Sequence, residues 1–233
     1  MSSSPEIPLE VWHIPTVTDP DTLSRLTQWL SPAEQQRAQH SITTAVRNTY
    51  ITSHAVMRLI LGRYAQQLPQ LLEFAYSKHG KPTLAHGIPF HFNLSHTRAY
   101  ALLGISSLCQ IGIDIEIIKP TRDILAIAKR FFSDSEYHWL AHMDTKQRYE
   151  NFFQLWCHKE AYLKARGLGL QGGLSSFSLS KEDLLATCCI EDDNKQRWWL
   201  QSLHVSDHYR AAVAVNCADM VPLERHWNIE DFS

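Results

Sequence analysis

The sequence predicts an α+β fold made of two similar lobes. Its 233 residues are enough for one large domain or two small ones, with a substantial buried core. Hydrophobic residues make up 44% and charged residues 20%, as in ordinary globular proteins. The expected order of elements is a strand, then helices, then three strands, and this order occurs twice. We therefore expect two lobes, 1–108 and 109–233, about a pseudo-twofold axis with a ligand cleft between them. The alternative is one continuous α+β domain whose element order resembles a repeat by chance.

The elements of the first lobe follow from local signals. Ser31 can cap a helix that has Pro32 at its first position, and Glu34 completes a capping box. A long helix is expected from about residue 44 to residue 67, because apolar residues recur along it and Pro69 lies just beyond. The other expected elements are strands at 9–14, 74–77, 90–94 and 99–105 and a turn at 79–82.

The second lobe is expected to begin with a strand over residues 110–118. Three helices follow: one at 124–132, one that begins at the capping box Ser133-x-x-Glu136, and one at 145–166. Gly167 and Gly169 stand where a helix C-cap is expected. Strands near 177–179, 198–203 and 209–215 complete the predicted lobe.

Composition excludes several classes of protein. A formal net charge of −2 argues against a general nucleic-acid binder. The number of cysteines is odd and no C-x-x-C pair occurs, which favours reduced thiols over disulfides. We see no signal-peptide pattern and no apolar run long enough to cross a membrane, so we expect a cytoplasmic protein. The 13 histidines form no H-E-x-x-H pair, so no zinc site is expected.

One predicted strand carries two carboxylates on a single face. Apolar and other residues alternate without a break through Ile111-Gly112-Ile113-Asp114-Ile115-Glu116-Ile117. Because strand side chains point to opposite faces in turn, Asp114 and Glu116 share one face. Their oxygens suit a hard cation such as Mg²⁺ or Mn²⁺. The alternative is a half-buried strand with a solvated acidic face. Gly112 indicates close approach of a ligand or of another backbone.

A predicted helix carries a lysine in an unexpected place. Lys159 falls in the middle of an apolar helix face, where its charge requires an anion, either a protein carboxylate or a ligand phosphate. Glu160 and Lys164 lie at the edge of that face with i,i+4 spacing. A surface ion pair worth a few tenths of a kcal/mol would explain those two residues equally well.

The strand around residues 90–94 ends in polar residues. Ser95 and His96 can donate hydrogen bonds to phosphate oxygens, and a protonated His96 adds positive charge. The alternative is a turn in which Asn93 or Ser95 bonds the nearby backbone.

These motifs together resemble a known family. Their order along the chain is similar to that of the 4′-phosphopantetheinyl transferases, specifically the larger type that activates surfactin synthetase. The resemblance covers roughly residues 31–179. It rests on Gly80-Lys81-Pro82, Phe92-Asn93-Leu94-Ser95-His96, Gly112-Ile113-Asp114-Ile115-Glu116, the segment 128–136 and Trp156-x-x-Lys159-Glu160-x-x-x-Lys164.

The resemblance implies an activity and a set of roles. The protein would transfer the 4′-phosphopantetheine group from coenzyme A to a serine of an acyl or peptidyl carrier protein and release 3′,5′-ADP. The implied metal ligands, for Mg²⁺ or Mn²⁺, are Asp114, Glu116 and Glu160. The implied catalytic residues are Glu160 as base, with Lys164 and His96 on the pyrophosphate. The implied coenzyme A contacts are Arg47, with Arg37 as a further candidate, Gly80, Lys81, Pro82, Ser95, His96, Lys159 and Lys164.

Two other functions use the same residues. A metal-dependent phosphohydrolase acting on a nucleotide would need the three carboxylates but no carrier protein. A non-catalytic module that binds coenzyme A or a carrier protein would not need Glu160 for its role. For the transferase, a monomer would suffice, because the expected cleft lies within one chain.

Overall fold

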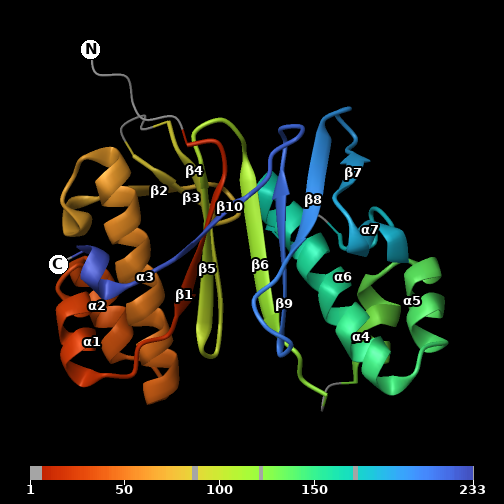
Figure 1. Cartoon of the computed structure of the whole chain (residues 1–233), viewed down its shortest axis with the longest axis horizontal. Helices are drawn as coiled ribbons and strands as arrows, with labels where there is room; N and C mark the ends of the chain where they lie inside the picture. Colours follow the sequence, from red (N-terminus) through yellow and green to blue (C-terminus); the bar gives the residue numbers. More distant parts are fainter. Residues whose placement is uncertain (1–6, 86–88, 121–122, 170–172, 233) are drawn as a thin grey trace.

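Two four-stranded sheets lie side by side in the middle of the molecule, and helices cover their outer faces (Figure 1). The structure is a computed structural model that describes residues 7–85, 89–120, 123–169 and 173–232. In spatial order, the first sheet consists of β10 (Leu223–His226), β1 (Glu10–Pro15), β5 (Tyr100–Ser106) and β4 (His91–Thr97). The second consists of β6 (Ile111–Ile117), β9 (Tyr209–Val215), β8 (Arg197–Leu203) and β7 (Cys188–Glu191). A small ribbon pairs β2 (Phe74–Tyr76) with β3 (Pro82–Leu84). The mixed α+β class is confirmed.

Two helices of 22 residues support the sheets, α3 (Thr44–Ala65) and α6 (Thr145–Arg166). Shorter helices flank them: α1 (Pro20–Thr27), α2 (Pro32–Gln39), η1 (Pro69–Leu71), α4 (Ile124–Phe131), α5 (Asp134–Ala141), α7 (Lys181–Leu185) and η3 (Ile229–Phe232). The predicted capping boxes begin α2 and α5, and Gly167 ends α6 with a φ of 67°. Within the described residues, no helix combines the length and apolar character needed to cross a membrane.

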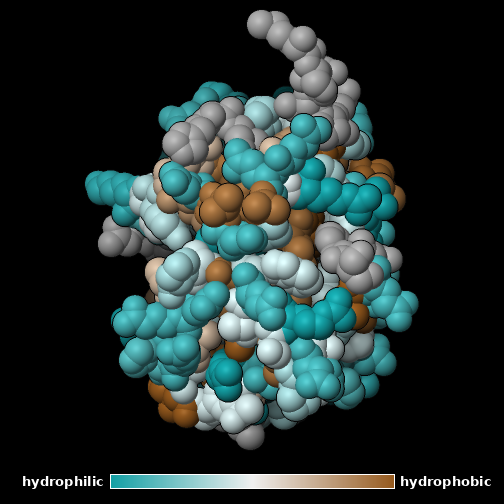
Figure 2. Space-filling model, turned by 90° about the vertical axis from the view of Figure 1, so that its left-hand side faces the viewer, coloured by the Kyte–Doolittle hydropathy of each residue, from teal (hydrophilic) through white to brown (hydrophobic). Residues whose placement is uncertain are grey.

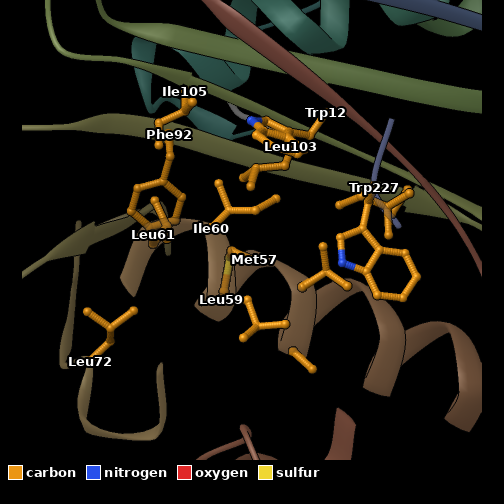
Figure 3. Packing of buried hydrophobic residues seen from close by; sticks show 14 of the residues in the cluster. Trp12, Met57, Leu59, Ile60, Leu61, Leu72, Phe92, Leu103, Ile105 and Trp227 are labelled. Atoms are coloured by element: carbon orange, nitrogen blue, oxygen red, sulfur yellow. The ribbon is translucent and has the colours of Figure 1, made fainter. Parts of the chain in front are cut away.

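The molecule has four layers: helices, the first sheet, the second sheet and helices. A hydrophobic cluster fills the space between each pair of neighbouring layers. One lies between the first sheet and α3, where Phe92 and Leu103 face Ile60 (Figure 3). A second lies between α6 and the second sheet, and a third joins the two sheets through residues such as Val11 and Ile113. The outer face of the first helical layer is mostly hydrophilic, with scattered apolar side chains (Figure 2). Burial of apolar surface on both sides of each sheet is the main source of stability here.

The C-terminal segment returns to the first sheet. Strand β10 pairs in parallel with β1, from Glu10–Leu223 to His13–His226. Trp227 then packs in the cluster beside α3 (Figure 3). The end of the chain therefore packs against elements of its first half.

The prediction of a strand at 177–179 is wrong. These residues are irregular, because buried side chains already use their backbone groups: Lys159 Nζ donates to Phe177 O, and Leu179 N donates to Glu136 Oε1. The fourth strand of the second sheet is β7, which the sequence analysis did not predict. It also missed α1, α7, β3 and β10.

One disulfide joins Cys109 to Cys217, with their Cα atoms 5.7 Å apart. The expectation of reduced thiols is wrong for this pair, whereas Cys157, Cys188 and Cys189 are free. Sequence spacing gave no sign of the pairing. The antiparallel register that sets Ile111 opposite Val215 brings the two cysteines together.

Candidate active site

Strand β6 divides its side chains between two environments, as its alternation predicts. Ile111, Ile113 and Ile115 are buried in the cluster between the sheets. The other face meets α6. A Cβ atom on Gly112 would lie 2.0 Å from Ala161 O and 2.3 Å from Ala165 N. Glycine is therefore required at this position because the backbone of α6 approaches closely, not because a ligand does.

Asp114 forms the centre of a buried polar network. It is 5% exposed, so the alternative of a solvated acidic face does not hold for this residue. Its Oδ1 lies 2.5 Å from Lys164 Nζ of α6 and accepts a hydrogen bond of 2.9 Å from Ser95 Oγ of β4. Lys164 Nζ also donates to Ser95 Oγ at 3.0 Å. The predicted residues Ser95, Asp114 and Lys164, from three separate elements, are thus in direct contact.

Two buried carboxylate oxygens in and beside this network lack a hydrogen-bond partner among the described residues. Asp114 Oδ2 and Glu160 Oε1 are buried and have no hydrogen-bond partner among the described residues. Buried carboxylate oxygens normally meet a donor or a cation, so this pair fits a hard metal ion. No three His, Cys, Asp or Glu side chains in the described ranges form a group that could hold a metal ion. The predicted set with Glu116 is therefore not a closed coordination sphere.

Glu160 is a buried carboxylate with a raised pKa. Burial raises its pKa to about 7, and the charges of Asp114 and Glu116 act in the same direction, while Lys164 opposes them. A base whose pKa lies near neutrality can both accept and release a proton under ordinary conditions.

A cavity of about 340 Å³ lies between α2, α3 and β4. His96 lines it on the strand side, and Arg37 lines it on the helix side. The Tyr50 ring stacks on the His54 ring with centroids 3.9 Å apart, and the Arg37 guanidinium lies 5.5 Å from the centroid of Tyr50. Burial lowers the pKa of His96, and the positive charges of Lys164 and Arg37 lower it further. The cavity therefore presents cationic and aromatic groups together.

A second cavity of about 240 Å³ adjoins the first, since Pro82, Asn93 and Leu94 line both. Gly80, Lys81 and Lys164 also line it. Lys81 Nζ reaches from the first half to the second and donates to Ile111 O at 3.0 Å and Ala165 O at 2.8 Å. Burial lowers the pKa of Lys81 to about 8. The predicted Gly80-Lys81-Pro82 turn is thus placed beside the predicted helix residue Lys164.

Lys159 does not face either cavity. Its side chain is 0% exposed, and its ammonium lies 2.9 Å from Glu136 Oε1. It also donates to Leu174 O at 2.7 Å and Phe177 O at 2.6 Å. The anion that the sequence required is therefore a protein carboxylate. All three donors of the ammonium are used, so the predicted contact of Lys159 with coenzyme A is contradicted by this geometry.

Arg47 also lies apart from the other predicted residues. It lines a different groove, of about 500 Å³, together with Leu23, Thr27 and Asn48. The basic residue that the helices direct into the His96 cavity is Arg37. The sequence analysis also missed Tyr50 and His54. Their i,i+4 spacing on the predicted long helix was an available signal, because such residues lie on one helix face.

Cationic side chains that line a cavity suit a ligand that carries phosphate groups. Comparison with known proteins agrees. The model of the 4′-phosphopantetheinyl transferase superfamily matches residues 110–214. The chain is 34% identical over 210 residues to the 4′-phosphopantetheinyl transferase HetI of Nostoc sp., covering 89% of this chain and 87% of that protein. It is 39% identical to psf-1 of Bacillus pumilus, over 63% of this chain and 61% of the relative. It is 29% identical to Sfp of Bacillus subtilis, over 81% and 83%.

The chain therefore belongs to the 4′-phosphopantetheinyl transferase superfamily.

Proposed function

We propose that this transferase moves the 4′-phosphopantetheine group from coenzyme A to a serine of an acyl or peptidyl carrier protein. Family membership and the relatives' names support the reaction. The observation that carries the site assignment is the contact of Asp114 with Lys164 and Ser95, beside the orphaned oxygens of Asp114 and Glu160. The serine oxygen would attack the β-phosphorus of coenzyme A, and 3′,5′-ADP would leave.

Coenzyme A would occupy the two adjoining cavities. Its phosphates carry several negative charges, and the side chains of Arg37, Lys81 and Lys164 line these cavities. His96 would contribute hydrogen bonds, and positive charge when it is protonated. The stacked pair Tyr50 and His54 offers a planar surface for the adenine ring. In this proposal, Arg37 takes the role that the sequence analysis assigned to Arg47.

A magnesium ion, with manganese as a substitute, would bind the unpartnered oxygens of Asp114 and Glu160 directly, and Glu116 through water or after a shift of its side chain. Such an ion stabilises negative charge that develops on phosphate oxygens during transfer. Lys164 supplies further positive charge from a fixed position, because Asp114 and Ser95 orient its ammonium. Glu160 would accept the serine proton, directly or through water, which its raised pKa permits.

The two halves of the chain would form two lobes about a pseudo-twofold axis. The arrangement of α3 against the first sheet and α6 against the second supports this proposal. The site draws Ser95 and Lys81 from one half and Asp114 and Lys164 from the other. Because one chain supplies residues from both sides, we propose that the enzyme acts as a monomer.

A mass measurement on the carrier tests this function. The protein is mixed with an apo carrier protein, coenzyme A and Mg²⁺, and the carrier is weighed by mass spectrometry. Formation of the phosphodiester should add about 340 Da to the carrier, because its serine acts as a covalent nucleophile. Release of nucleotide from coenzyme A without any carrier would instead indicate a phosphohydrolase. Absence of a mass gain on every carrier tested, with folded enzyme, would contradict the proposal.

A further inference from the structure

One edge of β6 is bonded by side chains instead of by another strand. Strand β6 pairs with β9 along one edge, and its other edge faces β4, which belongs to the other sheet. Four backbone groups on this edge have side-chain partners. These bonds are Lys81 Nζ to Ile111 O at 3.0 Å, Ile113 N to Asn93 Oδ1 at 2.8 Å, Lys164 Nζ to Ile113 O at 3.3 Å and Ile115 N to Ser95 Oγ at 3.4 Å. Side chains thereby fix the position of one sheet against the other.

Asn93 holds a central place on this edge. Odd-numbered residues of β4 point toward β6, since Asn93 and Ser95 both bond it, while even-numbered residues such as Phe92 and His96 point toward α3. Asn93 is 7% exposed. Its bond to Ile113 N is shorter than that of Ser95 to Ile115 N, and the Ser95 hydroxyl is shared with Asp114 and Lys164.

The Asn93–Ile113 bond affects the distance between the two halves of the proposed active site. His96 and Arg37 lie in the first half, whereas Asp114 and Glu160 lie in the second. Ile113, which Asn93 holds, directly precedes Asp114 in β6. A buried N–H that loses its acceptor is destabilised, and the strand edge would shift or admit water to satisfy it. Such a shift would move the carboxylates relative to groups that bind coenzyme A.

We propose that Asn93 is a positioning residue for phosphopantetheine transfer. Its Oδ1 sets the register of β6 against β4, and so places Asp114 opposite the ligand held by His96 and Arg37. This inference rests on the proposed assignment of coenzyme A to the first-half cavity. Reactions that depend on such alignment can lose about 10²-fold in rate when a group is misplaced by about 1 Å.

Asn93 also lines both cavities, so its Nδ2 group could contact the ligand instead. Two substitutions separate these roles. Asn93→Leu removes both the acceptor and the donor with little change in size. Asn93→Asp keeps an oxygen that can accept from Ile113 N and removes the Nδ2 donor. Thr97→Val serves as the matched control, because Thr97 is a buried polar residue on the same face of β4 for which the described residues show no bond to β6.

The first measurement is amide hydrogen exchange at Ile113 and Ile115 in enzyme without substrate. Asn93→Leu should accelerate exchange at Ile113 about 10-fold or more, because the amide loses its acceptor. Asn93→Asp and Thr97→Val should retain the protection seen in the wild type. Unchanged protection of Ile113 in Asn93→Leu would overturn the proposal. This result does not depend on activity, so it is separate from any failure of the proposed function.

The second measurement separates binding from turnover. Asn93→Leu should lower kcat about 10- to 100-fold while KM for coenzyme A stays within about 3-fold, because His96 and Arg37, the proposed ligand contacts, are unchanged. Asn93→Asp should recover most of kcat. A large rise in KM for coenzyme A in both variants, with Ile113 still protected in Asn93→Asp, would show a ligand contact and overturn the positioning role.

Discussion

The Lys164 ammonium lies 2.5 Å from the Asp114 carboxylate and 3.0 Å from the Ser95 hydroxyl, so both sheets and α6 meet at one cation. Replacement of Lys164 by Met leaves Asp114 charged and buried without its partner. We expect a loss of about 2 kcal/mol in the free energy of unfolding, because Asp114 is buried while Lys164 is partly exposed. Urea denaturation measures this loss. Adding Asp114→Asn to the Lys164→Met variant should recover part of the lost free energy of unfolding. Equal stability of Lys164→Met and wild type would contradict a stabilising ion pair between Lys164 and Asp114.

Arg37 and Arg47 differ in the cavity they line, which gives a paired test. Arg37→Ala should raise KM for coenzyme A about 10-fold, as expected for loss of a charge-assisted hydrogen bond to phosphate. Arg47→Ala should leave KM within about 2-fold, since an exposed charge in another groove adds little. Steady-state kinetics with varied coenzyme A measures both. The opposite ranking would restore Arg47 to the ligand site and remove Arg37 from it.

The Lys159–Glu136 ion pair should matter for stability and not for ligand binding. Lys159→Met leaves a buried Glu136 without its cation, and we expect a loss of about 3 kcal/mol or more in the free energy of unfolding. Below its melting temperature, the variant should bind coenzyme A as the wild type does, because Lys159 faces neither cavity. Calorimetric titration with coenzyme A measures this affinity. A loss of affinity without a loss of stability would indicate a ligand contact.

Glu160 should make stability depend on pH. Its pKa in the folded protein is raised to about 7 by burial and by Asp114. A raised carboxyl pKa favours the folded state below the usual pKa, and this contribution is lost as the pH rises through 7. Between pH 5 and pH 8 without divalent cations, wild type should lose about 1–2 kcal/mol relative to Glu160→Gln, after allowing for partial exposure.

The same pair of proteins tests the metal. If Mg²⁺ binds the carboxylates, its addition at pH 8 should raise the melting temperature of wild type and leave Glu160→Gln nearly unchanged, because binding to the folded state stabilises it. Parallel pH profiles for the two proteins would contradict the raised pKa. Equal responses to Mg²⁺ would contradict Glu160 as a ligand.

Local signals in the sequence predicted most of the elements and the shared face of Asp114 and Glu116. The alternation in β6 and the capping boxes of α2 and α5 depend on neighbours along the chain, so one sequence suffices to detect them. Lys159 showed the limit of this reasoning. Its position on α6 required an anion, but the identity of Glu136 depends on how α5 packs against α6.

Long-range pairing produced the other differences. The disulfide Cys109–Cys217 follows from strand register, and β10 follows from a crossing of the chain back to β1. Arg37 and Arg47 are both basic residues on predicted helices, and only the packing of α2 against α3 decides which one faces the cavity. Neither packing nor register leaves a pattern in local composition.

We propose that transfer occurs between β6 and α6 with Glu160 as base and metal ligand. The most direct test is the time course of carrier mass gain for wild type and Glu160→Gln, under the same carrier, coenzyme A and Mg²⁺. We expect conversion by wild type and a rate about 10²–10⁴-fold lower for the variant, the range expected for loss of a general base. Equal rates for the two folded proteins would contradict it.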